Sequence, residues 1–180
     1  VISWTPVDGV LAENVTVTVT DSIETVEQSF TINVTPVNDA PEITEGESAD
    51  LTTTEDTEGS ITLNATDIDS TTLTWSVATV ANDGVALVSG TGASQTVSYT
   101  PNADFNGVDT FVVEVSDGTD SDLITVNVTV DAANDAPIIT SEAVTTATED
   151  EAYSYTVTAT DIDEDTLTFS LVSVVEGMNI

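Results

Sequence analysis

The side chains that could do chemistry in this chain are almost all carboxylates. The chain has 33 Asp and Glu residues, and it has no Lys, Arg, His or Cys. A Ser nucleophile would therefore lack an ordinary base, and no Lys or Arg could stabilise an oxyanion. Paired carboxylates could in principle hydrolyse glycosides, but the acids recur along the chain instead of gathering at one position. We therefore expect no enzyme.

Closely spaced carboxylates can instead bind hard cations. Asp67 and Asp69 form one Asp-x-Asp pair, and Asp161 and Asp163 form a second. Calcium takes about six to eight oxygen ligands, so a site needs several acids that converge from different loops. In a chain this acidic, an isolated Asp-x-Asp is more often a solvated turn. The position of each pair in the fold must therefore decide between a turn and a metal site.

The formal net charge of −33 limits the partners of the chain. Nucleic acid and anionic membrane surfaces both require cationic side chains, so we expect neither as a partner. So much negative charge also repels itself. Even so, 39% of the residues are hydrophobic and occur in short alternating runs, which is typical of a folded chain. An acidic chain that folds indicates bound cations, high salt or both.

The elements that must position these acids repeat along the chain. Five motifs return in one order at offsets of 94 to 96 residues, which is the size of one β-sandwich domain. The motif pairs are Ile2–Pro6 with Val97–Pro101, Asn38–Pro41 with Asn134–Pro137, Thr54–Asp56 with Thr148–Asp150, Thr66–Asp69 with Thr160–Asp163, and Leu73–Ser76 with Leu167–Ser170. The period divides the chain into the last part of one repeat (1–37), one complete repeat (38–133) and the first part of a further repeat (134–180).

Within the complete repeat, the alternation of apolar and polar residues predicts β-strands. The alternating segments are 60–65, 73–77, 95–100, 110–116 and 123–130. Turn signals such as Asn-Gly and Asp-Gly separate them, and no segment has a helical period. We therefore predict an all-β chain of tandem antiparallel Greek-key β-sandwiches, with about seven strands per repeat.

Four aromatic residues occupy matching inward positions of the predicted strands. They are Trp4, Trp75, Tyr99 and Phe169. An exposed row of aromatic rings could bind sugars, but repeated inward positions in strands predict packing in the core.

The two partial repeats together supply nearly one complete repeat. They lack only about the counterpart of residues 87–95. On one interpretation the ends are arbitrary cuts in a long array. On the other, the C-terminal part of one subunit and the N-terminal part of the next assemble a split domain, which gives a head-to-tail fibre.

The junctions between repeats are where the acids should meet. Loops at one end of a sandwich gather at one pole. Acids at strand ends on the two sides of a linker should therefore face each other. Carboxylates at such short range repel one another unless a cation lies among them, so we expect a cation at each junction.

The order of the motifs resembles that of the bacterial cadherin-like tandem repeat of large surface proteins and adhesins. The motifs are Asn-Asp-Ala-Pro at 38–41, Ala-Thr-Asp-Ile-Asp at 65–69, Tyr-Thr-Pro-Asn-Ala-Asp-Phe-Asn-Gly-Val-Asp at 99–109 and Val-Ser-Asp-Gly at 115–118. The resemblance covers essentially the whole chain. It implies Ca²⁺ at the domain junctions, an extracellular location, and a role in adhesion or as a stalk.

The resemblance also implies a set of calcium ligands for each junction. The junction near 37–41 would use Asp8, Asn38, Asp39, Asp67, Asp69 and Asp117, with Glu13 as a second candidate. The junction near 131–137 would use Glu55, Asp104, Asp131, Asn134, Asp135, Asp161 and Asp163, with Asp56 and Asp109 as alternates. Asp21 matches Asp117 and would serve a preceding junction. Both linkers lack the full Asp-x-Asn-Asp-Asn of animal cadherins, which implies fewer or weaker ions per junction.

These expectations combine into one functional hypothesis and one alternative. The hypothesis is a calcium-stiffened extracellular repeat that forms the stalk or shaft of a bacterial surface adhesin or fibre. Its partners would be neighbouring repeats of the same chain. The alternative is an adhesion module that binds a glycan, a cell surface or another copy of itself, including a fibre subunit that polymerises through the split domain.

Overall fold

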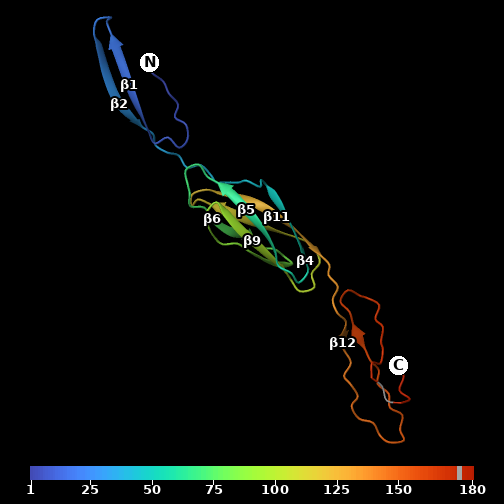
Figure 1. Cartoon of the computed structure of the whole chain (residues 1–180). Coiled ribbons are helices and arrows are strands. Elements are labelled where there is room, and N and C mark those ends of the chain that lie inside the picture. Colours follow the sequence, from blue (N-terminus) through green and yellow to red (C-terminus); the bar gives the residue numbers. More distant parts are fainter. Residues whose placement is uncertain (174–175) are drawn as a thin grey trace. The chain divides into compact units, whose positions relative to one another are not determined.

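The chain folds into strands and loops (Figure 1). The computed structural model describes residues 1–173 and 176–180. Contacts divide the chain into two units, Val1–Asp131 and Ala132–Ile180. The described residues form no helix, and so none that could cross a membrane. The predicted all-β class is confirmed.

Residues 38–131 form the complete repeat, a sandwich of two sheets. One sheet has the strand order β4-β11-β10-β6-β8, and the other has the order β3-β5-β9-β7. The strands are β3 (Glu42–Ile43), β4 (Ser48–Thr54), β5 (Gly59–Thr66), β6 (Thr74–Thr79), β7 (Gly84–Leu87), β8 (Gly90–Thr91), β9 (Ser94–Pro101), β10 (Gly107–Ser116) and β11 (Ser121–Asp131). The repeat exceeds the expected number of strands because β3 and β8, with two residues each, are too short to show an alternating pattern.

One strand pair departs from the predicted antiparallel arrangement. β4 runs parallel to β11, from Ser48 beside Thr125 to Thr54 beside Asp131. β10 and β11 form an antiparallel hairpin, which leaves one edge of β11 open. β4 comes from a distant segment, so no short turn dictates its direction against that edge. The other strand pairs of this sandwich are antiparallel, as predicted.

The inward residues of both sheets form the core of the complete repeat. Trp75, Tyr99 and Phe111 are at most 2% exposed. The rings of Tyr99 and Phe111 are stacked, with centroids 6.0 Å apart. Trp75 Nε1 donates a hydrogen bond of 2.8 Å to the Gly92 carbonyl oxygen, so the buried indole keeps a partner. The predicted core packing of Trp75 and Tyr99 is confirmed.

Residues 1–37 contain an antiparallel hairpin of β1 (Ala12–Thr20) and β2 (Thr25–Asn33). The apolar side chains of this part are poorly covered, since Trp4 is 44% exposed and Phe30 is 42% exposed. The predicted core packing of Trp4 is therefore wrong in this chain. Two strands provide no second layer against which the ring could be buried.

The second unit contains two short described strands, β12 (Ile138–Ile139) and β13 (Ala159–Thr160), which pair antiparallel. Phe169 lies in a loop segment and is 42% exposed, so its predicted core packing is also wrong. The cause is the same as for Trp4. A partial repeat supplies only part of the strands that bury the equivalent Trp75 in the complete sandwich.

Candidate metal centre

The first Asp-x-Asp pair lies in the loop that follows β5. Asp67 Oδ1 accepts hydrogen bonds from the backbone N–H groups of Asp69 at 2.9 Å and Ser70 at 2.7 Å. This local turn, in which an Asp side chain replaces a backbone acceptor, fixes the direction of the carboxylate. Asp67 Oδ2 has almost no exposed surface and accepts no hydrogen bond from the described residues. One oxygen of Asp67 thus holds the loop, and the other lacks a donor.

The linker between repeats is tied to this loop. The Asp39 N–H donates to Asp69 Oδ2 at 3.2 Å. This donor favours the charged form of Asp69, but desolvation by the surrounding protein, together with the Asp67 and Asp39 carboxylates, outweighs it and raises the pKa of Asp69. The carboxylates of Asp67 and Asp39 thus contribute to the raised pKa of Asp69, after desolvation.

Acids from separate segments of the first unit line one hollow beside the linker. The hollow has a volume of about 330 Å³, and its acidic lining residues are Asp8, Asp39, Glu42 and Asp67. Asp8 comes from the loop before β1, Asp39 from the linker, and Asp67 from the loop after β5. Carboxylate oxygens from different loops are the donor set that Ca²⁺ prefers. The oxygen of Asp67 that lacks a donor fits such an ion, because the sequence offers no cationic side chain to pair with it.

Asn38 fastens the linker to a second loop, the turn between β10 and β11. Its Nδ2 donates to Asp117 Oδ2 at 2.8 Å, to Asp120 Oδ2 at 2.9 Å and to the Asp39 carbonyl oxygen at 3.0 Å. The N–H groups of Asp120 and Thr119, followed by the Asn38 amide, lower the pKa of Asp117. Both oxygens of Asp117 are therefore engaged by protein donors. In this structure the predicted ligands Asn38 and Asp117 bind each other.

Asp21 occupies the same position in the β1–β2 turn as Asp117 does in the β10–β11 turn. Its Oδ1 accepts the N–H groups of Ile23 at 2.9 Å and Glu24 at 2.8 Å. The backbone donors of Glu24 and Ile23 lower the pKa of Asp21. Asp21 is exposed, and no hydrogen bond among the described residues joins it to another predicted ligand. Its proposed role at a preceding junction stays a prediction.

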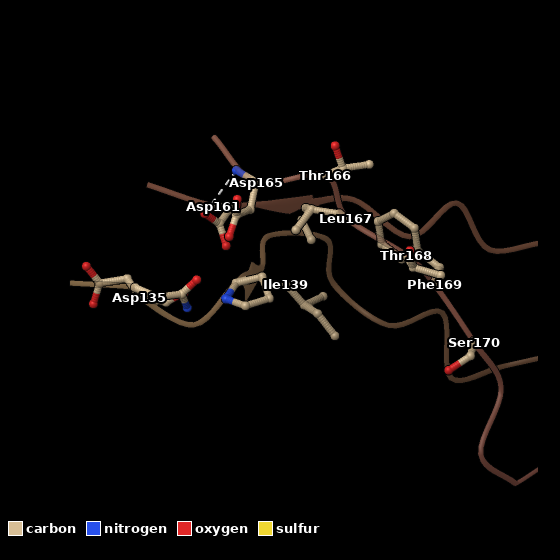
Figure 2. A pocket seen from close by; sticks show the side chains of 12 residues that line it. Asp135, Ile139, Asp161, Asp165, Thr166, Leu167, Thr168, Phe169 and Ser170 are labelled. Atoms are coloured by element: carbon tan, nitrogen blue, oxygen red, sulfur yellow. Dashed lines mark hydrogen bonds between the residues drawn. The ribbon is translucent and has the colours of Figure 1, made fainter. Parts of the chain in front are cut away.

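The second unit repeats the geometry of the first linker. The Asn134 amide donates to the Asp135 carbonyl oxygen at 2.8 Å, and the Asp135 N–H donates to Asp163 Oδ2 at 2.7 Å. Asp161 Oδ1 accepts the N–H groups of Asp163 at 3.1 Å and Asp165 at 3.3 Å. Figure 2 shows Asp135, Asp161 and Asp165 at one end of a pocket in this unit. The same linker-to-loop hydrogen bonds thus form twice in the chain.

The remaining predicted ligands lie at the end of the first unit where β4 and β11 finish. Glu55 is 3% exposed, and its N–H donates to the Asp131 carbonyl oxygen at 2.9 Å. Asn106 Nδ2 donates to Glu55 Oε2 at 3.4 Å. The Asp104 N–H donates to the side chain of the alternate candidate Asp56 at 3.2 Å. These acids come from two loops and from the end of β11, and their role as ligands stays a prediction.

The alternate candidate Asp109 has a structural role. It is 5% exposed, and its carboxylate accepts four hydrogen bonds. The donors are the N–H groups of Asn82, Asp83 and Thr110 and the hydroxyl group of Tyr99. Burial raises the pKa of Asp109, but these four donors outweigh burial and lower it. Asp109 therefore holds the loop before β7 against β10.

Two acids at the first linker were not among the ligands predicted from the sequence. Asp120 shares the Asn38 amide with Asp117, and Glu42 lines the hollow beside Asp39. The signal for Asp120 was the Asp-Gly turn, because a turn that starts at Asp117 brings the residue three positions later beside it. The signal for Glu42 was its place one residue after the Asn-Asp-Ala-Pro motif.

Comparison with known proteins identifies the complete repeat. The family described as bacterial Ig domain matches residues 38–130, which fold into the complete sandwich. No protein of curated function matches the chain.

Solved structures with similar folds come from several kinds of protein. Endo-fucoidan hydrolase MfFcnA4 from glycoside hydrolase family 107 is 22% identical over 68% of this chain and 19% of its own, with a TM-score of 0.45. Domains 4 and 5 of the S-layer protein SbsC are 16% identical over 65% of this chain and 58% of theirs, with a TM-score of 0.36. Titin domain M7 is 18% identical over 54% of this chain and 100% of its own, with a TM-score of 0.38. The chain spans only 19% of the fucoidan hydrolase.

The resemblance to bacterial cadherin-like repeats is thus supported at the level of a bacterial Ig-like repeat. The match covers the strands β3 to β10 and nearly all of β11, so it rests on the whole sandwich and on more than one motif. The chain belongs to the bacterial Ig domain family.

Proposed function

We propose that this chain is a calcium-stiffened, extracellular structural segment of a bacterial surface adhesin or fibre, of the cadherin-like kind. The observation that carries the proposal is the hydrogen-bonded linker described above. In both units an Asp of the linker donates its N–H to the second acid of an Asp-x-Asp pair. A bond pattern that recurs at each linker is expected of a junction element that serves every repeat of an array.

Four acids would hold the ion at the first linker. They are Asp8, Asp39, Asp67 and Asp69, and Glu42 lies beside them. Bound Ca²⁺ supplies positive charge among carboxylates that otherwise repel one another. The raised pKa of Asp69 and the oxygen of Asp67 that lacks a donor both support a cation in this place.

The residues of the chain hold the linker in register for that ion. Asn38 joins the linker to the β10–β11 turn, and Asp39 joins it to the loop after β5. Pro41 is buried, and its ring fixes one backbone angle where the linker enters the sandwich. Neutralising the acids would therefore stiffen a connection that is already fastened at two points.

We assign the chain no catalytic role, because it contains no Ser–base pair and no cationic side chain.

Calcium titration of the 180-residue chain tests the proposal. An ion that binds only the folded state at about 100 times its dissociation constant adds about 2.7 kcal/mol of stability. For a domain of the size of the complete repeat, that stability corresponds to a rise in Tm of roughly 10 to 20 °C. We expect this rise in calorimetry when Ca²⁺ replaces EDTA, together with a stiffer chain by small-angle scattering.

A charge-matched pair of variants separates a specific site from general screening. Asp67→Asn with Asp69→Asn should remove the calcium-dependent rise at the first linker. Asp50→Asn with Glu114→Gln removes the same charge from β4 and β10, and it should keep the rise. Equal responses of the two double variants, or no response of the unmodified chain to millimolar Ca²⁺, would overturn the proposed site.

A further inference from the structure

The complete repeat leaves one edge of its four-stranded sheet open at β7. The inner edge of β7 pairs antiparallel with β9, from Gly84 beside Pro101 to Leu87 beside Ser98. The sandwich has three other sheet edges: β3 and β8 have two residues each, and β4 carries Asp50. Folded sheets commonly protect an exposed edge by making it very short, or by placing a charge or a proline on it. β7 is longer than β3 and β8, and it has neither a charge nor a proline.

The backbone of β7 offers hydrogen-bonding groups at this open edge. Along an antiparallel strand, the residues that bond to the neighbouring strand alternate with those that do not. The Asn102 N–H donates to the Asp83 carbonyl oxygen at 2.8 Å, whereas Pro101, opposite Gly84, has no N–H group. Asp83 and every second residue after it therefore face β9, and Gly84 and Ala86 direct their N–H and C=O groups to the open edge. Among the described residues, no hydrogen bond from outside the β7–β9 ladder reaches these groups.

The outward side chains of β7 are apolar and exposed. Val85 is 54% exposed and Leu87 is 62% exposed, whereas Ala86 between them packs against the core. Apolar side chains that stand opposite each other on two paired strands stabilise the pairing. The open edge of β7 therefore offers both the backbone groups and the side chains that a further strand would need.

The face around this edge lacks the negative charge that dominates the chain. β5, β7 and β9 contain no acidic residue, whereas the opposite sheet has acids in β4, β10 and β11. Two acids border the face and have protein partners: Glu45 accepts the Asn64 amide at 2.8 Å, and Glu58 accepts the Thr100 hydroxyl group at 3.4 Å. Because the net charge of the chain is −33, two copies repel each other wherever their acids meet. The face of β5, β9 and β7 is where they can approach with little repulsion.

The pattern of this face recurs in the sequence of the following repeat. Residues 84–87 return as 177–180, where Met178 and Ile180 stand in the places of Val85 and Leu87. The outward positions of β5 return as Ser or Thr residues within 154–160. A contact that recurs once per repeat adds up along an array, so that each single contact can be weak.

We propose that β7 is a lateral contact through which two copies of the chain pair side by side. A second copy is the fitting occupant, because its own β7 has the same open edge and apolar side chains and brings no acid into the contact. With Ala86 opposite the partner's Ala86 in an antiparallel pair, Val85 lies opposite the partner's Leu87, and Leu87 lies opposite the partner's Val85. Asp83, the acid next to β7, then lies about 20 Å from the partner's Asp83 along the strands, at about 3.4 Å per residue. Such a two-fold contact closes at a dimer, and it does not depend on the proposed calcium site.

Sedimentation equilibrium of the 180-residue chain in EDTA tests this pairing separately from the calcium site. About 1 M NaCl shortens the screening length to about 3 Å, which limits repulsion between the acidic copies. We expect the mass to rise with protein concentration, and amide exchange to slow at Gly84 and Ala86. A chain that stays monomeric at submillimolar concentration would overturn the proposal and would leave the edge to a strand of a different protein.

A charge-matched pair of double variants locates the contact. Val85→Asp with Leu87→Asp should weaken association at least about 10-fold, because the new carboxylates of the two copies would face each other across the contact. Val108→Asp with Leu123→Asp adds the same charge at exposed positions of β10 and β11, and it should associate like the unmodified chain. Equal weakening by both double variants would overturn the assignment to β7. The near-ultraviolet signal of buried Trp75 verifies in each variant that the complete repeat is folded.

Single cysteine variants test the register of the pairing, because the chain has no Cys of its own. Opposite residues that exchange no hydrogen bonds have Cα atoms about 4.5 Å apart in an antiparallel pair, which is within the range of a disulfide, about 4.4–6.8 Å. In the proposed register, Val85 and the partner's Leu87 form such a pair. Under mild oxidation, an equimolar mixture of Val85→Cys and Leu87→Cys should therefore form covalent dimers faster than either variant alone. Equal rates in the mixture and in the single variants would contradict this pairing.

Discussion

Removing the Asp109 carboxylate should destabilise the complete repeat more than removing any one of its donors. Asp109→Ala leaves the Tyr99 hydroxyl without an acceptor in a residue that is 0% exposed. It also frees the N–H groups of Asn82, Asp83 and Thr110, which lie nearer to solvent and can recover part of the loss through water.

The size of the effect follows from these four bonds. Hydrogen bonds to a charged group contribute about 1.5–3 kcal/mol each, and a buried donor left without a partner costs about 1–3 kcal/mol. With the Tyr99 bond lost in full and the loop bonds lost in part, Asp109→Ala should cost about 3–5 kcal/mol. Tyr99→Phe removes one donor and leaves Asp109 three others, so it should cost only about 1–2 kcal/mol.

Urea unfolding followed by tryptophan fluorescence measures this difference. Trp75 is buried in the core, whereas Trp4 is 44% exposed. A Trp4→Phe background therefore restricts the signal to the complete repeat. If Asp109→Ala and Tyr99→Phe both stayed within about 0.5 kcal/mol of the parent chain, which is the range of ordinary surface substitutions, the buried carboxylate would not hold the loop.

The pH dependence gives an independent check of the same carboxylate. Its folded-state pKa is lowered, so Asp109 contributes stability that is fully present above its unfolded value of about 3.9. That stability is lost as the pH falls through the folded-state pKa. The stability difference between the parent chain and Asp109→Asn should therefore be constant at neutral pH and shrink below about pH 4. A difference that grew on acidification would contradict this sign.

Two further substitutions probe the sandwich and the linker. Gly84→Ala should cost about 1–3 kcal/mol in urea unfolding, because the added Cβ would lie 2.5 Å from Cε2 and Oη of Tyr99; an unchanged midpoint would show that the ring can move aside. Asn38→Ala should raise the pKa of Asp117 in an NMR titration, because the side-chain donor that favours its charged form is lost; an unchanged pKa would mean that the backbone donors alone set it.

The strands with clear alternation could be predicted from the sequence, and the short or unusual ones could not. The predicted segment 60–65 lies within β5, and 123–130 lies within β11. The parallel pairing of β4 with β11 carries no local signal, because a strand has the same alternation in either direction. The exposure of Trp4 and Phe169 was also not predicted. An inward position in a strand buries an aromatic ring only where the second sheet of the sandwich covers it.

The residues of the candidate site could largely be predicted from the sequence, whereas some of the contacts between them could not. The Asn-Asp-Ala-Pro motif and the Asp-x-Asp pair do lie together at the first linker, as the contact of Asp39 with Asp69 shows. The contact of Asn38 with Asp117 joins residues 79 positions apart, and only the folded sandwich brings them together. Asp109 could not be distinguished from a surface acid, because its burial depends on Tyr99 and on a loop that no motif marks.

The parallel ladder of β4 and β11 bears on how the repeat withstands tension. The chain enters the sandwich on the side of β3 and leaves it at the end of β11. Once the two-residue β3 has detached, a pull along the polypeptide draws the start of β4 and the end of β11 in opposite directions. Because the two strands run the same way, this load slides them past each other, and the hydrogen bonds from Ser48 to Thr54 share it. Such a ladder must yield all at once, whereas an antiparallel hairpin pulled at its open end unzips one pair at a time.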